Sequence, residues 1–175
     1  MQGEQPLQPV HGELARRADA QRSREHSLVL TSSAFAANGP IPRKYTGEGE
    51  NISPPLTWSG VPQDAKEFAL ICDDPDAPTP TPWVHWVVYG IPPTQRDLPE
   101  GAWEHLTLGQ NDFHKTGYGG PMPPPGHGVH HYSFRLYALD APLQAKPGLT
   151  KEQLVAVMRS HILAEGELVG TYERK

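Results

Sequence analysis

The sequence predicts an all-β fold, a sandwich or a barrel, on two observations. From Leu28 onward, short apolar stretches alternate with clusters of proline and glycine, which is typical of short strands joined by turns. The chain of 175 residues contains 20 prolines and 17 glycines, well above the roughly 12% share of an average protein. Because proline cannot donate a hydrogen bond to a strand ladder, these clusters must form loops or sheet edges.

Strands are expected between those breaks, where apolar residues dominate. The candidates are Ser33–Ala37, Leu56–Trp58, Glu67–Asp73, Val84–Ile91, His130–Asp140 and Glu167–Tyr172. The intervening clusters, such as Pro75–Pro82 and Pro121–Gly128, are predicted loops.

One helix is expected near the C-terminus. The run Thr150-Lys151-Glu152-Gln153 fits a capping box, and apolar residues then recur on one helical face until Gly166, where a helix can stop. That face consists of Leu154, Val157, Met158, His161 and Ile162. His161 is therefore expected to be a hydrogen-bonded core residue and not a ligand.

Composition excludes several classes of protein. The net charge of −5 argues against a nucleic-acid binder with a basic surface, and no apolar run approaches the ~20 residues that span a bilayer. The single cysteine, Cys72, excludes an internal disulfide framework and a zinc ribbon or finger.

Residues 1–27 lack a continuous apolar segment and are expected to be a flexible extension and not a secretory signal. Residues 28–175 then form one domain, with the cytoplasm as the expected location.

Candidate site residues follow from the period-two alternation of strands. Asp74 ends the apolar face that begins with Phe68, so its carboxylate is expected where the core meets a loop and needs hydrogen bonds there. In the next strand, His85 shares a face with Val87 and Tyr89.

The same alternation separates two adjacent histidines in the later strand. His130 shares the inward face with Tyr132, Phe134 and Leu136, whereas His131 points away. The loop before this strand, Gly117–Gly128, is rich in glycine and proline. Such a loop can form an anion-binding concavity or a plain connecting turn, and it matches neither a Walker A loop nor G-x-G-x-x-G.

Five motifs occur in order along the chain. They are Asn51-Ile52-Ser53-Pro54-Pro55-Leu56-x-Trp58, Asp73-Asp74-Pro75-Asp76-Ala77-Pro78, Val84-His85-Trp86-Val87-Val88, Gly117-Tyr118-Gly119-Gly120-Pro121 and Gly126-His127-Gly128-Val129-His130-His131-Tyr132. Together they resemble the phosphatidylethanolamine-binding protein family, more closely its prokaryotic Raf kinase inhibitor-like (YbhB/YbcL) branch. The resemblance covers about Leu28 to Arg174.

The resemblance implies an antiparallel β-sandwich with a few peripheral helices, one of them near the C-terminus, and a small anion pocket. It assigns to this pocket Asp74, His85, Gly119, Gly120, Pro121, His130 and Tyr132, with Asp76 and Tyr118 beside it. Two positions depart from the branch. Met122 stands where cysteine is frequent, which removes a thiol from the loop, and His131 stands where arginine is common, on the outer rim.

The function expected from these residues is recognition of a phosphate-containing small molecule or headgroup, without catalysis, cofactor or metal. Imidazoles donate hydrogen bonds to phosphate oxygens, more strongly when protonated, and the Tyr132 hydroxyl and backbone N–H groups near Gly119 and Gly120 would complete the shell. Asp74 would accept a hydrogen bond from one imidazole. Phosphate affinity is then expected to rise as the pH falls from 8 to 6.

The sequence also leaves alternatives to this function open. A metal-dependent hydrolase could use the cluster of nitrogen and oxygen ligands in the motifs. Those candidate ligands are Asp74, Asp76, His85, His127, His130 and His131. A regulatory module that binds a kinase or protease, and a homodimer, are implied by the resemblance alone.

Overall fold

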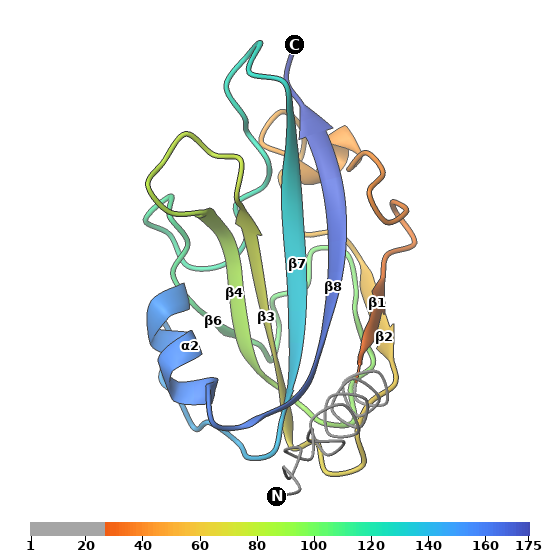
Figure 1. The fold of residues 1–175 in the computed structure, drawn as a ribbon, viewed down its shortest axis with the longest axis vertical. Coiled ribbons are helices and arrows are strands. Elements are labelled where there is room, and N and C mark those ends of the chain that lie inside the picture. Colours follow the sequence, from red (N-terminus) through yellow and green to blue (C-terminus); the bar gives the residue numbers. More distant parts are fainter. Residues whose placement is uncertain (1–26) are drawn as a thin grey trace, which may run out of the picture.

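The computed structural model describes residues 27–175 as two antiparallel sheets (Figure 1). The five-stranded sheet has the order β6-β4-β3-β7-β8, and the three-stranded sheet has the order β1-β2-β5. The elements are β1 (Val29–Thr31), η1 (Arg43–Tyr45), β2 (Leu56–Ser59), β3 (Glu67–Asp74), β4 (Trp83–Ile91), β5 (Asp97–Leu98), β6 (Thr107–Leu108), β7 (Val129–Leu139), α2 (Lys151–Met158) and β8 (Ile162–Glu173). The predicted all-β class with one helix near the C-terminus is confirmed.

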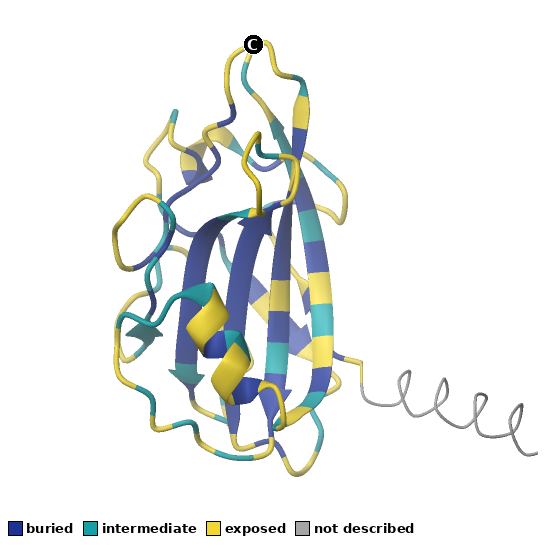
Figure 2. Ribbon diagram, turned by 60° about the vertical axis from the view of Figure 1, so that its left-hand side comes forward, coloured by how far each residue is buried: buried dark blue, intermediate teal, exposed yellow. Residues whose placement is uncertain are grey.

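The large sheet is covered on both faces, which explains its continuous apolar strands. All eight residues of β3 are buried. One face, with Phe68 and Trp86, packs into the core shared with the small sheet, and the other face packs against Leu154 and Met158 of α2. Figure 2 shows α2 lying across this second face.

The first predicted strand is wrong. Ser33–Ala37 forms bends, and the strand lies earlier, at Val29–Thr31. Phe35 misled the prediction, because it is 7% exposed and packs on Phe134 with ring centroids 5.9 Å apart. A loop side chain that reaches into the core carries the same apolar signal as a strand residue.

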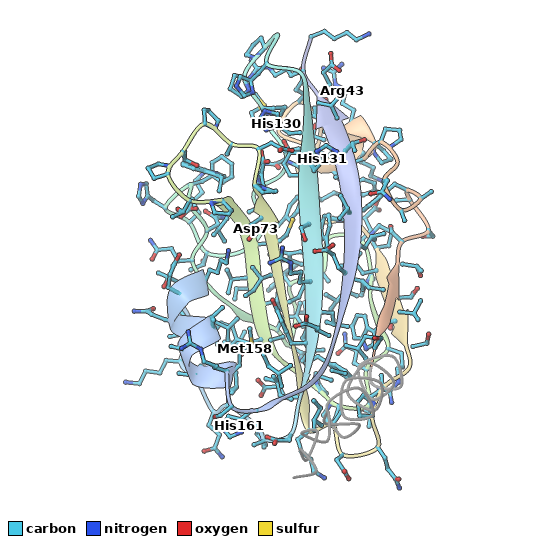
Figure 3. All side chains as sticks on the ribbon, viewed as in Figure 1. Arg43, Asp73, His130, His131, Met158 and His161 are labelled. Atoms are coloured by element: carbon cyan, nitrogen blue, oxygen red, sulfur yellow. The ribbon has the colours of Figure 1, made fainter. Side chains whose placement is uncertain are left out.

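The helix begins where the sequence predicts, but it ends earlier than predicted. Both hydrogen bonds of the capping box join Thr150 and Gln153, but the helix stops at Met158 (Figure 3). Ile162 and Gly166 belong instead to β8, where they lie opposite Leu139 and Leu136 of β7. Pairing along the length of β7 outweighs the helical period of this segment.

Three side chains of the predicted helical face are therefore not in the core, and one of them is Ile162, which is 37% exposed. Val157 is 46% exposed. His161 lies in the connection after the helix (Figure 3), and its Nδ1 atom is 2.8 Å from Oδ1 of the exposed Asp140. The expected hydrogen bond is present, but the expected burial is wrong.

The predicted extension 1–27 lies outside the described residues except for Ser27, which forms an isolated parallel bridge with Glu165. Within residues 27–175, no helix has the length and apolar content to cross a bilayer.

Candidate functional site

A pocket of about 230 Å³ lies where β3 ends and β4 and β7 begin. It is lined by Asp74, Ala77, Pro78, Thr79, Trp83, His85, Phe113, Met122, Pro123, Pro124, His130 and Tyr132. A larger hollow of about 470 Å³ lies along β8 beside Arg135 and Glu167. We regard the smaller pocket as the site, because it gathers the buried polar side chains and the larger hollow contains none of the predicted residues.

Four of the predicted side chains meet in this pocket. Asp74, His85, His130 and Tyr132 are each no more than 3% exposed. Asp74 is satisfied on both oxygens: Oδ2 lies 2.6 Å from Nδ1 of His130, and Oδ1 accepts the N–H of Asp76 at 2.8 Å. These bonds offset the desolvation of the buried carboxylate.

His85 reaches the pocket through an irregularity in the sheet. Cys72 lies opposite Trp86, but the next residue, Asp73, lies opposite Val84, so His85 is an extra residue in β4. Regular alternation placed His85 on the other face, with Val87, and this prediction is wrong. The β-bulge re-aims the side chain, and its ring contacts Tyr132 with centroids 5.1 Å apart.

The hydrogen bonds of His85 define its tautomer. Nδ1 lies 2.6 Å from the Gly119 carbonyl oxygen, and because a carbonyl only accepts, Nδ1 must carry the hydrogen. Burial lowers the pKa of His85, although the carbonyl of Gly119 and the carboxylate of Asp74 partly oppose the shift. In the neutral ring, Nε2 is therefore the nitrogen that can accept a hydrogen bond, and the residue lines the pocket.

The Tyr132 hydroxyl is a polar atom without a hydrogen bond in the described part of the chain, although it is fully buried. Burial, with a smaller contribution from Asp74, raises the pKa of Tyr132 far above its usual value. The hydroxyl therefore keeps its proton and is a donor whose hydrogen no described residue accepts.

The glycine loop supports the pocket in a different way from the one expected. The Gly119 N–H donates to the His85 carbonyl at 2.9 Å, and the Gly120 N–H donates to Oδ1 of Asn51 at 2.7 Å. The expectation that these donors face a ligand is wrong, since both are occupied within the chain. Gly119, Gly120 and Pro121 do not line the pocket. The loop instead fixes His85 through the Gly119 carbonyl.

The two residues expected beside the pocket lie outside it. Asp76 is exposed, and its Oδ2 atom accepts the backbone N–H of His131 at 2.8 Å and lies 2.7 Å from Nδ1 of the same residue. Tyr118 packs edge-on against Trp86 and donates its hydroxyl hydrogen to the carbonyl of Tyr45 at 2.5 Å. Figure 3 labels His130 and His131 near one end of the large sheet.

Sequence reasoning missed the apolar mouth of the pocket. Phe113 contacts both Trp83 and His85, with ring centroids 5.5 Å apart in each case, and Met122 is 42% exposed at the same mouth. Trp83 directly precedes a recognised motif and could have been included. Phe113 lies in a loop without any periodic pattern, so no sequence signal pointed to it.

The metal-hydrolase alternative has no support in the geometry. Among the described residues, no three His, Cys, Asp or Glu side chains are placed to hold a metal ion. His131 and Asp76 pair with each other outside the pocket. Nδ1 of His127 lies 2.7 Å from Nε2 of His130, which is a hydrogen-bond distance and leaves no room for an ion between the rings.

Comparison with known proteins gives consistent matches. A family model described as phosphatidylethanolamine-binding protein matches residues 31–173. A UPF0098 protein of Methanothermobacter thermautotrophicus is 50% identical, over 84% of this chain and 99% of the relative. The crystal structure of a putative phosphatidylethanolamine-binding protein homologue from Chlamydia trachomatis has a TM-score of 0.81 at 44% identity, covering 86% of this chain and 99% of the other. The structure of Escherichia coli YbcL has a TM-score of 0.80 at 34% identity, covering 85% and 99%.

Proposed function

This chain belongs to the phosphatidylethanolamine-binding protein family, and on that premise we propose that its pocket binds the phosphate group of a small molecule or headgroup without chemical conversion. The observation that carries the proposal is the buried Tyr132 hydroxyl, which lacks a hydrogen bond to any residue the structure describes. A free donor on a ring that contacts the ring of His85 is an arrangement that a ligand with several oxygens can complete.

The charge of the pocket defines how phosphate would bind. Among the residues that the structure describes, no lysine or arginine lines it, and one lining residue, Asp74, is acidic. Tyr132 donates to one phosphate oxygen. At His85, a lone pair on Nε2 would face a lone pair on oxygen, so one proton must lie between the two atoms. The phosphate group brings this proton, or the imidazole takes it up from solvent.

Affinity for phosphate should therefore rise as the pH falls. The free protein holds His85 with a lowered pKa, owing to burial, and bound phosphate favours its protonated form. Binding thus takes up a proton at any pH at which neither the phosphate group nor the His85 ring carries one. For a phosphate monoester this range lies above its second pKa of about 6. Uptake of one proton makes affinity rise by at most about tenfold for each pH unit lost.

The test is isothermal titration of the full chain with O-phosphorylethanolamine and with inorganic phosphate at pH 6, 7 and 8, in buffers of different ionisation enthalpy. His85→Asn keeps a donor for the Gly119 carbonyl and removes Nε2, so it should lower affinity and abolish proton uptake. His161→Asn changes a histidine outside the pocket and should bind as wild type. A flat pH profile, or no measurable binding at pH 6, would refute the proposal.

A further inference from the structure

A third histidine, His127, is attached to the pocket through His130. Oδ2 of Asp74 engages Nδ1 of His130 at 2.6 Å, so only Nε2 of that ring remains for another partner. Nε2 lies 2.7 Å from Nδ1 of His127. Whichever nitrogen carries the shared proton, His130 has no nitrogen available to a ligand while this bond stands.

The two rings of this bond are held very differently. His130 is 1% exposed and is fixed by Asp74 and by the pairing of β7 with Tyr172 of β8. His127 is exposed and lies between Gly126 and Gly128, whose φ angles are +71° and +91°. A Cβ atom at either glycine would meet nothing within 4 Å, so neither residue is packed against the fold.

Breaking the bond therefore requires movement of His127 alone. The His127 N–H donates to the Pro124 carbonyl and the Gly126 N–H donates to the Arg174 carbonyl, and these bonds hold the loop while the exposed side chain can rotate away. Rotation would free Nε2 of His130, a residue that lines the pocket together with Tyr132 and His85.

Resting on the function proposed above, we propose that His127 is a reversible cap on the pocket. In the free protein it occupies the ligand-binding nitrogen of His130, and it gives way when a phosphate group binds. The capped pocket offers a phosphate group His85 and Tyr132, and the released His130 adds a third partner. Each binding event then includes the loss of one hydrogen bond, which for a bond of ordinary strength lowers affinity about fivefold.

The affinity arm of the test compares three variants with wild type, using O-phosphorylethanolamine at pH 6. His127→Ala removes the cap and should bind about fivefold more tightly. His127→Asn places an amide near the position of Nδ1, can restore the bond to His130, and should bind as wild type. His131→Ala removes the neighbouring histidine that points away from the pocket and should also bind as wild type. Equal or weaker binding by His127→Ala would overturn the cap.

A second arm needs no ligand. Diethyl pyrocarbonate acylates accessible neutral imidazole nitrogens, and the modified histidines are located by peptide mass spectrometry. In free His127→Ala, His130 should react several-fold faster than in wild type or His131→Ala, and equal rates would overturn the proposal. If wild type and every variant fail to bind the phosphate probe, the proposed function fails, while the acylation rates still decide whether His127 covers His130.

Discussion

Replacing Tyr132 with phenylalanine should leave the free protein as stable as wild type or more stable, while it weakens phosphate binding. The hydroxyl is buried without a hydrogen bond to the described residues, so folding removes it from water without replacing the lost interaction. Such a group destabilises a fold by about 1–3 kcal/mol. Part of this gain is lost because phenylalanine leaves a small void, so we expect a net stabilisation of about 0–1 kcal/mol, or up to about 4 °C in Tm.

Tyr89 provides the matched control in the same sheet. It is also 1% exposed, but its hydroxyl donates to the Lys146 carbonyl and accepts the Leu149 N–H at 3.1 Å. Tyr89→Phe removes the same atom and leaves two backbone groups without partners. It should lower the free energy of unfolding by about 1–3 kcal/mol and leave phosphate binding nearly unchanged.

Urea unfolding, differential scanning calorimetry and ligand titration measure both effects on the same preparations. We expect opposite signs for Tyr132→Phe: stability kept or gained, and phosphate affinity reduced about tenfold, as for a lost hydrogen bond to a charged group. A loss of stability as large as that of Tyr89→Phe would refute it, because the Tyr132 hydroxyl would then be hydrogen-bonded in the free protein and would not be waiting for a ligand.

Three further changes test other parts of the structure. Burial raises the pKa of Glu67, so the contribution of this side chain to stability falls as the pH rises through the raised pKa. Glu67→Gln should therefore raise the free energy of unfolding, measured with urea, by about 1 kcal/mol at pH 7 and by little at pH 4. Nζ of Lys151 lies 2.6 Å from Oδ2 of the buried Asp73, so Lys151→Met leaves this carboxylate without its cation. The variant should lose about 2 kcal/mol of stability, and adding Asp73→Asn should restore part of the loss. Full stability of the single variant would contradict this. A Cβ at Gly119 would lie 2.5 Å from the Phe113 ring, so Gly119→Ala should lower Tm and phosphate affinity together, and unchanged calorimetry would contradict the packing argument.

Much of the fold could be predicted because the strands are bounded by proline and glycine and filled with apolar residues. β3, β4 and β7 lie within one or two residues of their expected bounds. The errors arose where tertiary contacts override a local pattern. Phe35 fills the core from a loop, and Ile162 joins β8 because β7 offers it a pairing partner.

The site was harder to predict than the fold, because its geometry depends on an irregularity that strand alternation does not contain. Alternation correctly placed Tyr132 on the inward face and His131 on the outer one. It failed for His85, because the order of apolar and polar residues does not show where a β-bulge inserts an extra residue into a strand. The roles of Gly119 and Gly120 were misjudged for a similar reason. The N–H groups of a glycine loop can face a ligand or form hydrogen bonds within the chain, and a sequence pattern is the same in both cases.

Buried polar atoms without partners are not by themselves evidence for a site, because this chain has such atoms both at the pocket and away from it. Trp58 Nε1 and Glu67 Oε2 also lack hydrogen bonds among the described residues, yet neither residue lines the pocket. At the pocket, the free Tyr132 hydroxyl coincides with a bulge that turns His85 toward it and with a buried carboxylate paired to His130. Of these three features, the free hydroxyl destabilises the folded chain when taken alone, whereas the Asp74 carboxylate is satisfied by its hydrogen bonds. Their convergence on one hollow is explained if a ligand supplies the missing interactions, whereas the same features scattered through the core would be explained by imperfect packing.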